Sequence, residues 1–178
     1  MRRVIFLILL SLFYAVPAGC AGGKGGDMDM KLTSPAFENN SNVPPEFTCE
    51  GKDVNPPLII ENIPAGTKSL ALIVDDPDAP MKTWVHWVVY DIEPAGKITQ
   101  DSFPGKQGIN DFGKTDWGGP CPPSGTHRYY FKIYALDKML GLDEGIDRSE
   151  LERAMEGHVL ARAELVGVYK RSFMDKHR

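Results

Sequence analysis

The sequence predicts a mainly β domain, packed as a sandwich or a barrel, with one or two short helices near the C-terminus. Two observations lead to this fold class. Turn-forming residues are dense, with 18 Gly and 14 Pro in 178 residues. Short apolar runs rich in β-branched and aromatic residues lie between the turns, as is typical of strands. Such strands bury their apolar sides when sheet packs on sheet or when one sheet closes on itself.

Five apolar runs have the length and composition of strands. They cover residues 58–63, 69–75, 84–92, 127–136 and about 164–170. The run 69–75 is nearly all apolar, which predicts a strand buried on both faces. Strict alternation divides the side chains of the run 84–92 between two faces, one with Trp84, His86, Val88 and Tyr90 and the other with Val85, Trp87 and Val89.

One segment near the C-terminus has the pattern of a helix. Asp147 and Glu150 have the spacing of a capping box, in which each side chain accepts a backbone N–H of the other residue. Leu151 and Met155 then follow at helical spacing, and Gly157 is a suitable stop. The sequence therefore predicts one short helix before the last strand.

The first twenty residues have the layout of a secretory signal. Arg2 and Arg3 precede an apolar stretch over residues 4–16, and small residues lead to Cys20. As a helix the apolar stretch covers about 20 Å, which is short of the ~30 Å hydrocarbon core, so a permanent span is not expected. Cys20 is the predicted lipidation site of a bacterial lipoprotein box. Ordinary cleavage within two residues of it is the alternative.

The chain is thus divided into a signal peptide (1–20), a Gly-rich linker (21–29) and one domain (30–178). This predicts an exported protein of the cell envelope or periplasm, held by a lipid anchor, or secreted if no lipid is attached. Without Arg2 and Arg3 the formal charge changes from −4 to −6. An acidic body without a run of basic residues excludes nucleic acid as a partner. Membrane contact is expected only through the anchor.

Cys49 and Cys121 remain once Cys20 is assigned to the N-terminal signal. In an exported protein they are candidates for a disulfide, with two buried free thiols as the alternative. A bridge across a loop of about 70 residues would stabilise the fold by about 4 kcal/mol in the chain-entropy model.

Three segments are candidates for function: residues 75–80 (DDPDAP), 84–88 (WVHWV) and 118–129 (GGPCPPSGTHRY). The first is a loop directly after a buried strand, where function is often placed, although a solvated turn explains Asp and Pro equally well. In the second, a His between apolar neighbours is more often a core residue than a ligand. In the third, glycines allow close approach of backbone N–H groups and prolines order the loop.

Together these segments suggest an oxyanion pocket. His127 and Tyr129 share one strand face and would present an imidazole and a phenol to the same cavity. Imidazole, phenol and loop N–H groups would donate hydrogen bonds, and Asp76 could orient an imidazole through its second nitrogen. A His that becomes charged would favour phosphate without a basic patch. Arg128 points the other way and is expected to pair with Asp78.

The same segments resemble the signatures of the phosphatidylethanolamine-binding protein family, also called Raf kinase inhibitor-like proteins, and the C-terminal end resembles the bacterial branch. The resemblance extends from about Lys31 to Arg171. It implies a sandwich of antiparallel sheets with a small pocket at one end, which holds phosphate-like or acetate-like anions and phospholipid head groups.

The resemblance also implies the ligand-binding residues. They are Asp76, Pro80, Trp84, His86, Gly119, Pro120, His127 and Tyr129, with Asp78 and Arg128 as structural support. Many family members have a second His where this chain has Val85, so a less polar pocket rim is expected here. The C-terminal helix that lines the pocket in animal members has no clear counterpart after Lys170.

The leading functional hypothesis is therefore non-enzymatic binding of a small anion or phosphorylated head group, with no cofactor and no metal. Inhibition of a protease or kinase through protein contact is the alternative, and a homodimer is compatible with the sequence. A less favoured hypothesis is a metal-dependent hydrolase that uses Asp75, Asp76, Asp78, His86 and His127. Against it, Asp-Pro-Asp in one turn should direct its carboxylates apart.

Overall fold

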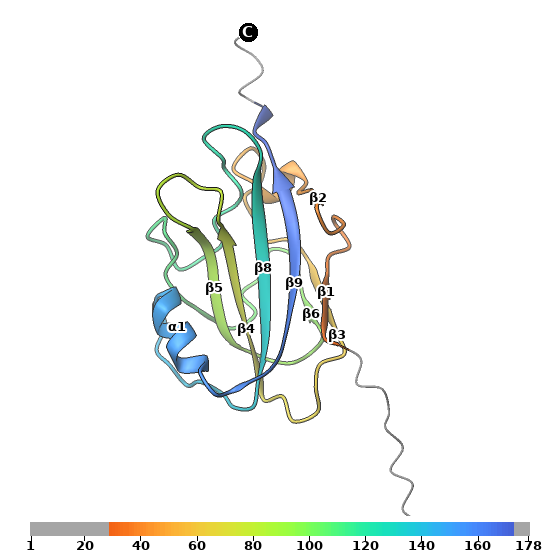
Figure 1. The fold of residues 1–178 in the computed structure, drawn as a ribbon, viewed down its shortest axis with the longest axis vertical. Helices are drawn as coiled ribbons and strands as arrows, with labels where there is room; N and C mark the ends of the chain where they lie inside the picture. The colour runs from red at the N-terminus through yellow and green to blue at the C-terminus, as the bar shows by residue number, and fades with distance from the viewer. Residues whose placement is uncertain (1–28, 173–178) are drawn as a thin grey trace, which may run out of the picture.

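The computed structural model describes residues 29–172, which form a two-sheet sandwich with one α-helix (Figure 1). The signal peptide, Cys20 and all of the linker except Asp29 lie outside the described residues. The strands are β1 (Lys31–Thr33), β2 (Ser41–Asn42), β3 (Leu58–Glu61), β4 (Ser69–Asp76), β5 (Trp84–Ile92), β6 (Lys97–Ile98), β7 (Lys106–Gln107), β8 (His127–Leu136) and β9 (Val159–Tyr169). The helices are the 3-10 turn η1 (Pro45–Phe47) and α1 (Arg148–Met155).

The two sheets differ in size. The large sheet has the strand order β2-β9-β8-β4-β5-β7, and the small sheet has the order β1-β3-β6. All neighbouring strands are antiparallel except β2 and β9, which are parallel. The large sheet ends at β2 and β7 and does not close on itself. The predicted β-sandwich is confirmed, and the barrel is not formed.

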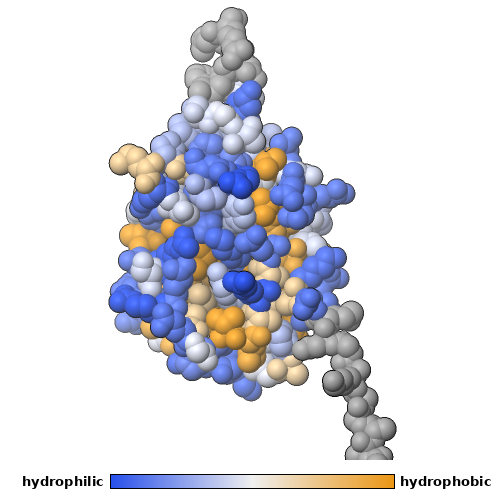
Figure 2. Space-filling model, viewed as in Figure 1, coloured by the Kyte–Doolittle hydropathy of each residue, from blue (hydrophilic) through white to orange (hydrophobic). Residues whose placement is uncertain are grey.

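The large sheet is covered on both faces, which gives the molecule two apolar cores. One core lies between the sheets and contains Leu72, Val74 and Phe131. The other lies between the large sheet and α1 and contains Ile73 and Leu151. Strand β4 is consequently buried at every position, as its apolar sequence predicted. On the outer face, polar side chains cover much of β8 and β9, whereas apolar side chains protrude near the β4–β5 loop (Figure 2).

Strand β5 contains a β-bulge that changes which side chains face the pocket. Asp75 pairs with Val85 and Val74 pairs with Trp87, so His86 is an extra residue without a partner on β4. The predicted strict alternation is therefore wrong beyond this position. Trp84 and His86 keep the inner face, but Val88 and Tyr90 pack with Val85 in the core under α1.

Helix α1 starts as the sequence predicts. The Asp147 side chain accepts the Glu150 N–H at 2.8 Å, and the Asp147 N–H donates to the Glu150 side chain at 2.9 Å. Such a cap contributes about 1 kcal/mol to the free energy of unfolding. The last strand was expected from about Glu164 but begins at Val159. Its first half pairs with β8 and packs only the small side chains of Ala161 and Ala163 on the core, which is a weak signal in the sequence. Within the described residues, no helix is long and apolar enough to cross a membrane.

Candidate functional site

The predicted functional segments meet at one end of the sandwich, where the β4–β5 loop and the loop before β8 lie together (Figure 1). A cavity of about 240 Å³ opens there. Its wall is formed by Asp76, Ala79, Pro80, Trp84, His86, Phe112, Cys121, Pro123 and Tyr129. Five of the eight expected ligand-binding residues are thus brought together around one space. Gly119, Pro120 and His127 do not form part of its wall.

Asp76 ends strand β4 with its carboxylate toward the inner side of the sheet. It is 3% exposed, and both of its oxygens are engaged. Its Oδ2 lies 2.7 Å from His127 Nδ1, and its Oδ1 accepts the Asp78 N–H at 2.8 Å. Because a carboxylate is the acceptor, His127 Nδ1 carries the proton of this hydrogen bond. His127 therefore fixes the carboxylate of Asp76 and is not part of the cavity wall, and its expected contact with a ligand stays a prediction.

His86 is buried and its tautomer follows from its partner. Nδ1 lies 2.6 Å from the Gly118 carbonyl oxygen, which can only accept, so Nδ1 is the protonated nitrogen. The ring meets Tyr129 and Phe112 edge-on, at centroid distances of 5.1 and 5.3 Å. Burial lowers the pKa of His86, against the opposing effects of the Gly118 carbonyl and of nearby aspartates. His86 is therefore a neutral imidazole, and the expected charged donor is not supported at this position.

Two buried hydrogen-bond donors in the cavity wall have no acceptor among the described residues, although the Cys121 backbone N–H donates to the oxygen of one of them. They are the hydroxyl of Tyr129 and the indole N–H of Trp84, and both atoms are buried. The pKa of Tyr129 is raised mainly by burial and also by the charge of Asp76, while the backbone of Cys121 acts in the opposite direction. The phenol thus keeps its proton and can donate it.

The glycines of the loop before β8 do not serve a ligand. The Gly118 N–H donates to the His86 carbonyl at 3.1 Å, and the Gly119 N–H donates to Asp53 Oδ1 at 2.8 Å. A Cβ at Gly119 would lie 2.3 Å from Asp53 Oδ1, so glycine is needed here for packing against the η1 loop. The N–H groups of Gly118 and Gly119 are therefore already engaged within the protein and are not free for an anion.

A disulfide joins Cys49 and Cys121, whose Cα atoms are 5.5 Å apart. Pro120, expected at the ligand, instead accepts the Cys49 N–H with its carbonyl at 3.3 Å. Cys121 also forms part of the cavity wall. The bridge therefore fastens a wall of the cavity to the loop after η1.

The expected pair of Asp78 and Arg128 is present, between the β4–β5 loop and the start of β8. The guanidinium donates to both carboxylate oxygens, at 2.8 and 2.6 Å, and the Arg128 backbone N–H donates at 2.9 Å. These contacts lower the pKa of Asp78 to about 2. The pair holds the loop after Asp76 against the start of β8, which is the supporting role that the resemblance implied.

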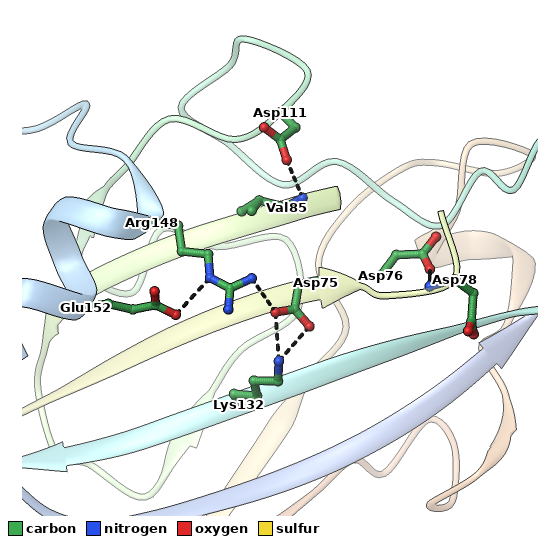
Figure 3. A network of polar contacts seen from close by, with 8 residues as sticks. All are labelled: Asp75, Asp76, Asp78, Val85, Asp111, Lys132, Arg148 and Glu152. Atoms are coloured by element: carbon green, nitrogen blue, oxygen red, sulfur yellow. Dashed lines mark hydrogen bonds and ion pairs between the residues drawn. The ribbon is translucent and has the colours of Figure 1, made fainter. Parts of the chain in front are cut away.

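Asp75 lies on the opposite face of β4 from Asp76 and does not reach the cavity. It is fully buried and binds Lys132 at 2.7 Å and Arg148 of α1 at 2.8 Å (Figure 3). Asp75, Asp76 and Asp78 thus bind three different sets of groups and do not converge on one point. Among residues 29–172, no group of three His, Cys, Asp or Glu side chains is arranged to hold a metal ion. The geometry gives the metal-dependent hydrolase no support.

Sequence reasoning missed part of the cavity wall. Phe112 contacts both Trp84 and His86 edge-on, and its only sequence signal is an aromatic residue inside a polar, Gly-rich loop. Ala79 and Pro123 lie within the candidate segments 75–80 and 118–129 but were not singled out as ligand-binding residues. Val85, expected to make the rim less polar, lies outside this cavity and packs in the core under α1, because it points to the face opposite Trp84 and His86.

Comparison with known proteins agrees with this fold. The family model described as phosphatidylethanolamine-binding protein matches residues 33–170. The chain belongs to the phosphatidylethanolamine-binding protein family. Among its relatives, a UPF0098 protein of Pyrococcus horikoshii is 47% identical over 183 residues, covering 96% of this chain and 91% of the relative. A UPF0098 protein of Aquifex aeolicus is 47% identical over 156 residues, covering 82% and 91%. The names of these relatives indicate no enzymatic activity.

Two solved structures share the fold. A phosphatidylethanolamine-binding protein homologue from Chlamydia trachomatis has a TM-score of 0.79 and 40% identity, covering 81% of this chain and 99% of its own. Escherichia coli YbcL, described as a member of the mammalian family, has a TM-score of 0.75 and 30% identity, covering 82% and 100%. The family thus extends over archaeal and bacterial relatives of this chain.

Proposed function

We propose that the cavity binds a small oxyanion, such as the phosphate group of a phosphorylated head group, without converting it chemically. The observation that carries this proposal is the pair of buried, unpartnered donors, the Tyr129 hydroxyl and the Trp84 N–H. A buried donor without a partner costs about 1–3 kcal/mol, so native proteins rarely keep one without a use. Acceptor oxygens of a ligand would satisfy both groups at once. The family name points to the same class of ligand.

The composition of the wall supports binding rather than catalysis. The one sulfur in the wall belongs to the disulfide and is no free nucleophile. The carboxylate of Asp76 already accepts two hydrogen bonds inside the protein. Apolar side chains, including Pro80 and Phe112, make up much of the remaining wall. These groups can orient and desolvate a ligand, but they supply no activated nucleophile.

Calorimetric titration of phosphoethanolamine, phosphate and acetate tests this proposal. Tyr129→Phe removes one donor and leaves the ring in place, so we expect affinity to fall about 10- to 100-fold, the value of a hydrogen bond to a charged group. Tyr134→Phe is the matched control, because Tyr134 lies on the outer face of the same strand, away from the cavity. Absence of binding by folded wild type to all three ligands would refute the proposal.

We also propose that the protein is exported and anchored through Cys20. The N-terminal pattern supports this, and so does the disulfide, because such bonds persist mainly in oxidising compartments. Mass spectrometry of the protein from its native membrane fraction provides the test. We expect a mature N-terminus at Cys20 carrying lipid, whereas an intact Met1 would contradict export by this route.

A further inference from the structure

The hydrogen-bonding role of each polar atom in the cavity can be assigned. The neutral His86 ring donates its only N–H, at Nδ1, to the Gly118 carbonyl, so its other nitrogen, Nε2, carries a lone pair. Among the described residues Nε2 has no hydrogen-bond partner, and the side chain forms part of the cavity wall. His86 therefore offers the ligand an acceptor, whereas a phosphate-binding site is usually expected to offer donors.

The charged groups that act on His86 are carboxylates, of which Asp75 is already paired with Lys132 and Arg148, and Asp76 with His127. Asp76 at the end of β4, Asp75 beside it and Asp53 in the loop after η1 all act on this imidazole. From β8 it faces the neutral phenol of Tyr129, and from the loop before β8 it faces the Gly118 carbonyl. No Lys or Arg belongs to the cavity wall among the described residues. Lys82, which lies over the Trp84 ring, is paired with Asp111 at 2.6 Å.

The cavity thus combines two neutral donors with two acceptors, His86 Nε2 and the carboxylate of Asp76. A fully ionised oxyanion could use the Tyr129 and Trp84 donors, but it would place a lone pair against His86 Nε2 and a second charge beside Asp76. An oxyanion that keeps one proton fits better. Its O–H would donate to Nε2 while its other oxygens accept from the two donors.

We propose that the cavity selects singly protonated oxyanions, such as the monoanion of a phosphate monoester. In this proposal His86 Nε2 accepts the hydrogen bond from the remaining O–H of the ligand. This inference rests on the proposed function, since it concerns the same cavity. It goes beyond that function because it says which protonation state of the ligand the cavity binds. The neighbouring carboxylates explain why the selected ligand carries only one negative charge.

Methyl phosphate and methyl sulfate test the inference, because they have nearly the same shape and differ in one proton. At pH 5 both carry a single negative charge, but only methyl phosphate has an O–H, since the second pKa of a phosphate monoester is about 6. We expect methyl phosphate to bind at least about tenfold more tightly, the value of one hydrogen bond with a charged partner. Equal affinities would overturn the inference and leave the proposed function standing, whereas absence of binding by both would overturn both.

The pH dependence separates a protonated ligand from a protonated histidine. Between pH 6 and pH 8 the monoanion fraction of methyl phosphate falls from about one half to about one hundredth, so its apparent affinity should fall about fiftyfold. The affinity of methyl sulfate should stay constant. If formation of an imidazolium were responsible, both ligands would weaken in parallel, and the inference would fail.

Two further measurements examine His86 directly. His86→Phe keeps a ring against Phe112 and should bind methyl phosphate and methyl sulfate equally, while the exposed His158→Phe should keep the wild-type preference. Nitrogen-15 NMR of the wild-type imidazoles needs no variant to fold. We expect the signature of a proton on His86 Nδ1 at pH 7. A proton on Nε2, or a preference retained in His86→Phe, would overturn the assignment.

Discussion

Asp75 and Asp76 are consecutive residues at the end of β4, yet they lie in opposite environments (Figure 3). On the outer face, Asp75 is 0% exposed and binds the cationic groups of Lys132 and Arg148. On the inner face, Asp76 is 3% exposed and binds one imidazole and one backbone N–H. Successive side chains of a strand point to opposite faces, so a single step along the chain separates the two sites.

The difference teaches how one strand serves stability and binding at once. The outer carboxylate has its full complement of countercharge, and Arg148 in turn contacts Glu152, so this network is complete in itself. The inner carboxylate stands beside the unpartnered donor of Tyr129 and the free lone pair of His86. The inner side therefore has hydrogen-bonding groups left over for a ligand in the cavity.

The largest effect should come from breaking the outer network. Asp75→Asn keeps the shape but leaves Lys132 and Arg148 facing each other without their shared anion. We expect the free energy of unfolding to fall by about 3 kcal/mol, the lower end for a broken buried pair because both cations are partly exposed. Urea denaturation provides the measurement. Asp137→Asn, which removes an exposed pair with His158, should cost about 0.5 kcal/mol or less. An equal loss in both variants would contradict this account of Asp75.

Asp76→Asn sharpens the comparison, because it should affect binding more than stability. The amide can still accept the Asp78 N–H, so we expect a loss of about 1 kcal/mol in the free energy of unfolding. Removal of the negative charge should make methyl sulfate bind about tenfold more tightly than it binds to wild type. Parallel denaturation and calorimetry would measure both. A stability loss as large as that of Asp75→Asn would show that the two carboxylates do not differ in role.

The smallest effect concerns Asp78, which lies beyond Asp76 and pairs with Arg128 (Figure 3). Its pKa lies at about 2 in the folded protein and at 3.8 as the ordinary value, so the unfolded chain binds the proton more readily. The stabilisation is therefore complete above about pH 4–5 and is lost as the pH falls through 4 toward 2. Because the Arg128 side chain is 52% exposed, solvent screening reduces this contribution to the free energy of unfolding to about 1 kcal/mol.

Denaturation of wild type and Asp78→Asn between pH 5 and pH 2 measures this contribution. The wild type should be more stable at pH 5, and the difference should shrink toward pH 2. A difference that stays constant over this range would mean that ionisation of Asp78 does not stabilise the fold.

Local sequence patterns predicted the parts of the fold whose side chains decide their structure. The runs 84–92 and 127–136 have the bounds of β5 and β8, because dense aromatic and β-branched residues end at turn-forming residues. The capping box predicted the start of α1 for an equally local reason. The pair of Asp78 and Arg128 and the disulfide were also foreseen, as contacts between residues that the motifs and the cysteine count single out.

The remaining features depend on contacts that no local pattern encodes. Strands β1, β2, β6 and β7 have two or three residues each and exist only through pairing. The tautomer of His86 depends on the Gly118 carbonyl, which lies 32 residues away in the chain. The use of the Gly119 N–H depends on Asp53, which no motif included. Chemical type was therefore readable from the sequence, but the direction of each hydrogen bond was not.

The bulge in β5 has a consequence for how this family can evolve. His86 is the surplus residue of the strand, because its neighbours on either side already pair with β4. Loss of this one codon would remove the bulge next to the cavity and the proposed acceptor in the same step, while the irregularity between Leu70 and Leu72 would stay. Descendants that keep the architecture but have abandoned the ligand can thus arise by a three-nucleotide deletion. They would be recognised by a shortened interval between the two tryptophans of this strand.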